Sequence, residues 1–410
     1  MDLSGGIPCT IASATMKASL LLHTRLVGAG AAVVAGGVMT VNIGGAQSEE
    51  AISKAHPRVL VATYPANNPT EDRSVHQSGP GGWQAAAVFD GHGGWQVAEL
   101  AHRTMLQHVA AAYAARAHAG GLLSYLYTDP ALDCIVHMEQ DLLGAFRSVE
   151  KTFKDKVSAA FALGFGPLAK VGCCALVCLQ RGDRLVLANL GDCRAVLGSS
   201  LALAPSSSSP PSSSFSTAAQ FKYLATRLTH DHNARVALEA LQLRRRHPNE
   251  TDIIRCKSPT ACYVKGRLQL TSALGDLYLK YPEFNAPASS HRSGGRHIPP
   301  PYTPPYVNSV PEVTTVRLQR GGGDACTDRF VILATDGLWD ELTDQEAVSI
   351  VGQCVQAGAP QEAADQLVAA ALAHAAADCR MTLDELRALP PGDQRRGRHD
   401  DTTAVVLYLD

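Results

Sequence analysis

The sequence has no strong charge of either sign. Its 410 residues carry 36 Lys and Arg against 38 Asp and Glu, which gives a formal net charge of −2. A near-neutral balance without a basic stripe gives no reason to expect nucleic-acid binding. Hydrophobic residues make up 46% of the chain. This content supports a sizeable core and excludes a disordered tail protein.

Paired cysteine motifs are also missing. The chain has 11 cysteines, an odd number, and no CxxC pair or Cys/His spacing typical of a zinc site. Cys173, Cys174 and Cys178 fall within one apolar run. We therefore expect buried free thiols in a reducing compartment rather than a disulfide framework.

Acidic residues are scarce in the N-terminal segment, residues 1–50, where Asp2 is the only one before residue 49. Low acidity with scattered bases is typical of an organelle transit peptide, so the segment predicts mitochondrial or plastid targeting. Residues 26–41 carry no charge, but a membrane span needs about 20 residues. A membrane anchor behind the targeting sequence is one alternative. A disordered or partly packed tail is another.

The rest of the chain, residues 56–410, predicts one folded domain. A Ser/Pro-rich insertion at 198–219 and a Pro-rich loop at 286–305 interrupt it. Short apolar runs predict strands at 84–89, 174–180, 184–189, 330–335 and 403–409. Helices are expected at 96–119, 141–161, 344–357 and 360–378, with Asp344 as the N-cap of the third. This mixture of hairpins and helices argues against a doubly wound sheet.

Carboxylates recur where the apolar runs meet loops. They are Glu71, Asp72, Asp90, Asp192, Asp336, Asp340, Asp400 and Asp401. Carboxylates brought together repel one another unless cations neutralise them, and Mg²⁺ or Mn²⁺ prefers oxygen ligands. Two such ions about 3.5–4 Å apart can activate a water and hold a phosphoryl group. The pattern therefore predicts a divalent-metal centre.

Two residues next to Asp90 are further candidates for this centre. Glycines allow close approach to the backbone, so the carbonyl oxygen of Gly91 is a candidate ligand. His92 lies between glycines, two residues from Asp90. It is a candidate proton donor to a leaving alkoxide.

Eight motifs occur in order between residue 71 and the end of the chain. They are EDRS at 71–74, VFDGHGG at 88–94, GCCA at 172–175, ANLGDCRA at 188–195, LTHDHN at 228–233, LTSALGD at 270–276, ATDGLWD at 334–340 and HDDTT at 399–403. Together they resemble the metal-dependent Ser/Thr protein phosphatase family (type 2C). The resemblance implies an α+β fold, a four-layer α-β-β-α sandwich with two antiparallel sheets face to face and helices outside.

The resemblance also implies roles for the candidate residues. Asp90 would bridge two Mg²⁺ or Mn²⁺ ions. Glu71 and the Gly91 carbonyl would complete one ion's site, and Asp336 and Asp400 the other. Asp72 would support the ligands. Asp192, together with Asp336 and Asp340, matches the place of a weaker third ion in some members. His92 would be the general acid while a metal-bridging hydroxide attacks phosphoserine or phosphothreonine.

Two positions depart from the family pattern. Many members have an arginine that holds the substrate phosphate where this chain has Asn67, which we expect to contact the substrate instead. Ser272 replaces an arginine that usually precedes the Ala-Leu-Gly-Asp motif. Ser272 is the one feature that favours a pseudophosphatase, a folded scaffold without turnover, as an alternative. A two-metal phosphoesterase acting on small molecules or nucleic acid is a second rival.

Further motifs resemble two groups within the family. Residues 278–285 (YLKYPEFN), 304–306 and 311–313 are similar to the catalytic subunits of pyruvate dehydrogenase phosphatase and to a plant subgroup that acts on membrane proton pumps. The early NPTEDRS run at 68–74 and the N-terminal segment favour the first group. This reading predicts a mitochondrial protein of the matrix or inner membrane, with the phosphorylated pyruvate dehydrogenase complex as its partner.

Overall fold

The computed structural model describes residues 58–79, 82–119, 130–202, 221–287, 290, 297–321 and 326–409. All of them belong to one compact unit, Lys54–Asp410. The expected targeting segment, residues 1–50, lies outside the described residues. Within the described part, the helices are too short or too polar to cross a membrane.

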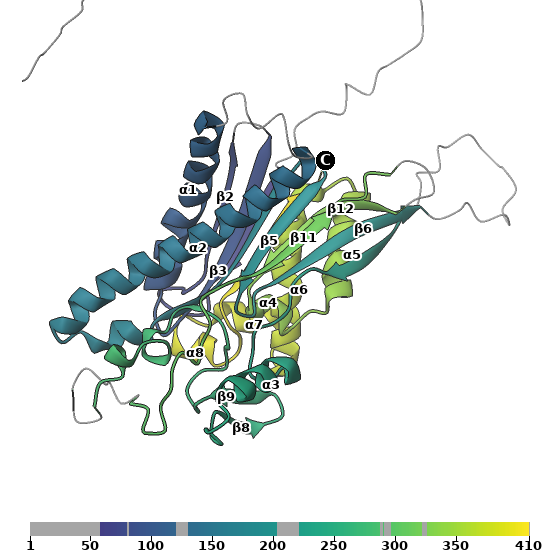
Figure 1. The fold of residues 1–410 in the computed structure, drawn as a ribbon. Coiled ribbons are helices and arrows are strands. Elements are labelled where there is room, and N and C mark those ends of the chain that lie inside the picture. Colours follow the sequence, from purple (N-terminus) through teal and green to yellow (C-terminus); the bar gives the residue numbers. More distant parts are fainter. Residues whose placement is uncertain are drawn as a thin grey trace, which may run out of the picture. The chain divides into compact units, whose positions relative to one another are not determined.

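Two antiparallel sheets form the centre of this unit (Figure 1). The strand order in the first is β1 (Val59–Tyr64), β13 (Thr402–Tyr408), β12 (Thr327–Ala334), β6 (Arg194–Ala202) and β7 (Phe221–Arg227). The order in the second is β11 (Glu312–Arg317), β5 (Arg184–Leu190), β4 (Gly172–Arg181), β3 (Trp83–His92) and β2 (Arg73–Gly79), with β10 (Leu274–Gly275) also pairing with β4. Phe89, Val331 and Val405 belong to one buried cluster that draws on both sheets. Strands β3, β4, β12 and β13 read as nearly continuous apolar runs because both faces of each are covered.

Helices cover the outer face of each sheet. Helices α1 (Gln96–Ala119) and α2 (Pro130–Ala162) pack on the second sheet, and α5 (Asp344–Gln356) and α6 (Ala363–Asp378) on the first. Figure 1 shows these two pairs on opposite sides of the sheets. The structure thus confirms the predicted four-layer sandwich.

A smaller excursion separates β7 from β10. It contains α3 (Ala237–Arg246) and a hairpin of β8 (Ile254–Ser258) and β9 (Ala261–Val264). The Lys265 Nζ donates to Glu250 Oε2 at 2.8 Å, and both side chains are almost fully buried. The pair joins the base of the hairpin to the turn after α3. The remaining short elements are α4 (Asp336–Trp339), α7 (Leu383–Ala388), α8 (Asp393–Arg396) and the 3₁₀ turns η2 (Gly166–Lys170), η3 (Leu277–Leu279), η4 (Pro282–Phe284) and η6 (Pro360–Glu362).

The five predicted strands are all present as β3, β4, β5, β12 and β13, most of them a few residues longer than expected. The helix at 96–119 is confirmed as α1. The helix expected from 141 begins at Pro130, and the one expected from 360 begins as η6 before α6.

The expected cap of α5 is wrong. The N-cap is Thr343, whose hydroxyl accepts from the Glu346 N–H in a capping box. Asp344 instead accepts from Arg194 Nη1 at 3.0 Å and from Arg227 Nε at 2.8 Å. Two guanidinium groups therefore hold the Asp344 carboxylate, which the local sequence alone predicts as the N-cap of α5.

Both predicted interruptions differ in part from the structure. Strand β6 continues to Ala202, paired with β7, and the rest of the insertion, residues 203–219, lies outside the described residues. The described part of 286–305 contains no helix or strand. It is not wholly a surface excursion, because Ile298 is only 2% exposed and joins the core.

The cysteines follow the expectation with one exception. Cys173, Cys174, Cys178 and Cys193 are buried free thiols. Cys256 and Cys262, which face each other across the β8–β9 hairpin, form a disulfide that the spacing did not predict.

Candidate active site

The predicted carboxylates meet near the ends of strands from both sheets. Asp90 lies near the end of β3, and Asp72 directly precedes β2 in the same sheet. From the other sheet, Asp336 begins α4 directly after β12, and Asp400 lies just before β13. Glu71 precedes Asp72, and Asp192 lies in the turn between β5 and β6. Each sequence-predicted ligand is thus on a loop or strand end that the sandwich holds in place.

Burial and mutual repulsion disturb the ionisation of this cluster. Burial raises the pKa of Asp90 well above its usual range, and repulsion from Asp336 and Asp72 adds to the effect. Burial also raises the pKa of Asp336 well above its usual range, and repulsion from Asp192 and Asp400 adds to this effect. Burial and Asp401 raise the pKa of Asp72 to about 8. Burial also raises the pKa of Glu71 and of Asp400.

This donor set fits hard divalent cations. All of the predicted ligands offer oxygen atoms, and the raised pKa values of Asp90 and Asp336 show the effect of burial and mutual repulsion on crowded carboxylates. Arg396 forms an ion pair with Asp400. The buried Asp72 Oδ1 has no hydrogen-bond partner among the described residues. Beside the cluster, a hollow of about 220 Å³ is lined by Gly337, Asp340, Glu341, Asp400 and the loop 396–399. Cations of the size of Mg²⁺ or Mn²⁺ would neutralise this cluster, and the hollow leaves a route to it.

Asp401 differs from its neighbours and organises the loop that carries Glu71. Its Oδ1 accepts from the Ala66 and Asn67 N–H groups at 2.6 and 2.8 Å, and its Oδ2 accepts from the Glu71 N–H at 2.7 Å. Although burial opposes ionisation, these hydrogen bonds hold the pKa of Asp401 below its usual value. Asp401 is therefore a structural anion, a role that its sequence neighbour Asp400 does not share.

Asn67 lies in the same loop. Its Nδ2 donates to Asp401 Oδ2 at 3.1 Å. The amide that was predicted to contact the substrate is thus engaged in holding the loop. Its contact with the substrate stays a prediction.

His92 has a partner that the sequence did not single out. Its Nε2 lies 2.7 Å from Asp276 Oδ2, and the Asp276 side chain is 1% exposed. Burial opposes charge on His92, but the attraction of Asp276 outweighs it and raises the histidine's pKa. The LTSALGD motif contained Asp276, yet nothing in the sequence placed it beside His92.

Glycine at position 172 makes room for this pair. Gly172 lies opposite His92 in the β3–β4 ladder. A Cβ atom there would lie 2.2 Å from His92 Nε2 and 2.1 Å from Asp276 Oδ2. Any side chain at 172 would therefore displace the histidine or its partner. Gly91, whose carbonyl is a candidate ligand, directly precedes His92 on β3 and is buried.

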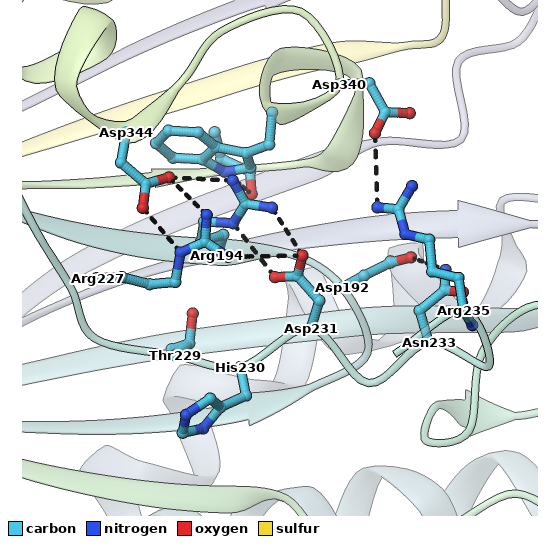
Figure 2. A network of polar contacts seen from close by, with 12 residues as sticks. Asp192, Arg194, Arg227, Thr229, His230, Asp231, Asn233, Arg235, Asp340 and Asp344 are labelled. Carbon is cyan, nitrogen blue, oxygen red and sulfur yellow. Dashed lines mark hydrogen bonds and ion pairs between the residues drawn. The ribbon is translucent and has the colours of Figure 1, made fainter. Parts of the chain in front are cut away.

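Asp192 and Asp340, the residues predicted for a third ion, lie beside the loop 228–235 (Figure 2). Asn233 Nδ2 donates to Asp192 Oδ2 at 2.9 Å, and Arg235 Nη2 lies 3.7 Å from Asp340 Oδ1. Arg194 holds the same loop by donating to Asp231 Oδ2 at 2.7 Å. Asp192 is buried, whereas the Asp340 side chain is 56% exposed. Asp192 is thus fixed in place, and Asp340 lies at the rim.

Comparison with known proteins identifies the class. Residues 63–380 match the family model described as protein phosphatase 2C, so the chain belongs to the protein phosphatase 2C family. Members of this family are metal-dependent serine/threonine phosphatases, and this chain is one by the same evidence.

Particular relatives come from plants. The chain is 33% identical to "Probable protein phosphatase 2C 68" of Arabidopsis thaliana over 85% of this chain and 77% of that protein. It is 32% identical to "Probable protein phosphatase 2C 43" of Oryza sativa subsp. japonica over 88% and 80% of the two chains. Its fold is similar to the crystal structure of a serine-threonine phosphatase 2C from Toxoplasma gondii, with a TM-score of 0.55, 19% identity and coverage of 86% and 94%.

Proposed function

We propose that the carboxylate cluster holds two Mg²⁺ or Mn²⁺ ions and that the chain uses them to hydrolyse phosphoserine and phosphothreonine in proteins. The observation that carries this proposal is the convergence of Glu71, Asp72, Asp90, Asp336 and Asp400, all with raised pKa values, at one end of the sandwich. Bound there, the ions would supply a nucleophilic water at neutral pH and neutralise charge on the phosphoryl group.

Individual side chains take distinct roles in this proposal. Asp90 would serve both ions, Glu71 and the Gly91 carbonyl would help to hold one, and Asp336 and Asp400 would hold the other. Asp72 accepts from the Thr335 hydroxyl at 2.9 Å, and so ties the start of β2 to the end of β12 behind the ligands. Asp192 and Asp340 would bind a third, weaker ion.

His92 supplies the proton for the leaving group. Asp276 holds Nε2, so Nδ1 is the nitrogen left to give a proton to the serine or threonine oxygen. The His92 side chain is 24% exposed, which leaves it within reach of a substrate. The raised pKa favours the protonated form that a general acid requires.

For the substrate, we propose the pyruvate dehydrogenase complex, with a mitochondrial location directed by residues 1–50. The support is the NPTEDRS run at 68–74 and the composition of the N-terminal segment, whereas the run YLKYPEFN at 278–285 and the prolines at 304 and 305 fit both groups. Tyr278 and Tyr306 are fully buried in the core, so these runs contribute to the packed structure beside Asp276. Attachment of the N-terminal segment to the inner membrane is part of the same proposal.

A phosphatase of the plant subgroup that acts on membrane targets is the second candidate. It is favoured by the plant origin of the relatives. A pseudophosphatase is disfavoured because the carboxylates proposed as ligands, Glu71, Asp90, Asp336 and Asp400, are all present and interact with neighbouring carboxylates. Ser272, its only support, pairs through the backbone with Asn308. Within the part of the chain that the structure describes, no hydrogen bond joins its side chain to the carboxylates.

One experiment separates these proposals. The full chain is incubated with phosphorylated pyruvate dehydrogenase α-subunit and with a generic phosphothreonine peptide, each with Mn²⁺, Mg²⁺ or chelator. We expect metal-dependent release of phosphate from both substrates, and faster release from the dehydrogenase subunit. Release from the peptide alone would discard that substrate, and no release from a folded, metal-loaded chain would establish the pseudophosphatase.

A further inference from the structure

A thiol lies among the carboxylates of the candidate active site. Cys174 on β4 is directly opposite Asp90 on β3, and its Sγ donates to Asp192 Oδ1 at 3.2 Å. One ligand atom from each of Asp90, Cys174 and Asp192 lies within 4.8 Å of the other two. Zinc–sulfur and zinc–oxygen bonds of about 2.3 and 2.0 Å put neighbouring ligand atoms of a tetrahedral ion roughly 3.5 Å apart. The three side chains therefore have a spacing that one ion can span after small shifts.

The positions of the thiol and of Asp192 are fixed by their surroundings. Cys174 is 2% exposed. A Cβ atom at Gly191 would lie 2.4 Å from its Sγ, so glycine at 191 leaves the space that the sulfur fills. The other oxygen of Asp192, Oδ2, accepts from Asn233 at 2.9 Å (Figure 2). This contact leaves Oδ1 to accept from the thiol.

We propose that Cys174, Asp90 and Asp192 form a binding site for a thiophilic divalent cation, Zn²⁺ or Cd²⁺. Thiolate sulfur selects such ions over Mg²⁺ and Mn²⁺, which prefer all-oxygen ligands. On binding, the thiol proton is released to solvent and a sulfur–metal bond replaces the hydrogen bond to Asp192. Because Asp90 also serves the hydrolytic centre in the proposed function, occupancy by zinc would inhibit hydrolysis. This inhibitory consequence rests on that proposal, whereas the binding itself does not.

The test is a cadmium titration of the full chain after treatment with chelator. A thiolate-to-cadmium charge-transfer band in the ultraviolet reports a Cd–S bond whether or not the protein is active. We expect a tight binding phase in the wild type that is lost in Cys174→Ser, and an affinity about 10–100-fold weaker in Asp192→Asn. The matched control is Cys178→Ala. Cys178 lies four residues further along β4, opposite Ala86 and Leu187 within the core, and its removal should leave the tight phase unchanged.

A second variant, Cys174→Ala, covers the case in which the serine variant fails to fold, with circular dichroism as the check on both. A tight phase that persists in the folded Cys174 variants, or that disappears in Cys178→Ala instead, would overturn the proposal. Phosphate release with Mn²⁺ is a separate assay. Failure of the cadmium test would leave the proposed hydrolysis intact, and failure of hydrolysis would not affect the cadmium band.

Discussion

At the scale of single residues, charge decides the behaviour of the candidate active site. Asp400 and Asp401 are neighbours in sequence, yet burial raises the pKa of the first, while backbone N–H groups lower that of the second. Burial keeps the pKa of Asp400 raised although Arg396 forms an ion pair with it, whereas hydrogen bonds already satisfy Asp401. Sequence spacing cannot separate such neighbours, because the difference depends on the loop 66–71 folding back onto Asp401.

Asp90→Asn should reduce phosphate release more than about 100-fold while the chain stays folded, because it removes the bridging carboxylate of the proposed centre. In the presence of chelator, the variant should unfold at the same temperature as the wild type or higher. It loses a charge that is repelled by Asp336 and Asp72. Activity near the wild-type level would refute the assignment of Asp90.

Asp276→Asn tests the pair that holds His92. A general acid contributes about 10²–10⁴-fold to the rate. The variant should lower kcat on a phosphothreonine peptide by a factor within that limit. An aryl phosphate has a leaving group that needs little protonation, so kcat on that substrate should fall much less. Equal losses on the two substrates would show that Asp276 acts only in folding or metal binding.

At the scale of elements, apolar runs predicted the strands and most helices, while tertiary contacts set several boundaries. The strand at 403–409 was predictable because TAVVLYL has the composition of a buried strand. The cap of α5 was not, because Asp344 is held by Arg194 and Arg227 from the neighbouring strands. The Cys256–Cys262 disulfide was not predicted because it depends on the pairing of β8 with β9. The sequence of this segment has no strong strand pattern.

The buried pair Lys265–Glu250 should stabilise the excursion between β7 and β10. Lys265→Met leaves the Glu250 carboxylate buried without its cation and should lower the free energy of unfolding by about 3–5 kcal/mol. The matched control is Arg255→Met. This substitution breaks an exposed ion pair with Asp252 and should lower the free energy of unfolding by no more than about 1 kcal/mol. Similar losses in urea denaturation of the two variants would contradict this account.

The same pair predicts a pH dependence. Although burial opposes its ionisation, hydrogen bonds from Lys265, Thr303 and Tyr306 lower the pKa of Glu250 below its usual 4.5 in the folded chain. A carboxylate whose pKa is lower in the folded chain than in the unfolded chain stabilises the fold when the pH is above its unfolded-state pKa. This contribution is lost as the pH falls through its folded-state pKa. The free energy of unfolding should therefore fall below about pH 4.5, and Glu250→Gln should make that fall shallower. An identical acid profile in the variant would exclude the contribution.

At the scale of the whole molecule, two sheets bring distant segments to one site. Glu71 and Asp400 are separated by most of the chain, yet they meet because β1 pairs with β13 and β2 lies in the facing sheet. The motif order was enough to predict this fold and the set of carboxylates. It was not enough to predict Asp276 beside His92 or Cys174 beside Asp192, because both contacts depend on the β3–β4 register and on adjoining turns.

The location proposed for the molecule is testable apart from its chemistry. A fusion of residues 1–50 to a fluorescent reporter should accumulate in mitochondria, because the segment has the low acidity of a transit peptide. A fusion of residues 51–100 is the control and should stay in the cytosol. A cytosolic 1–50 fusion would count decisively against mitochondrial targeting, and plastid accumulation would favour the plant subgroup.

The central claim is that the carboxylate cluster is a metal centre. Its most direct test is calorimetric titration of Mn²⁺ into the full chain after removal of metals with chelator. The account predicts at least two bound ions per chain, with binding weakened at least about tenfold in Asp336→Asn. A folded chain that binds no Mn²⁺, or that binds it equally well without the Asp336 carboxylate, would contradict the account.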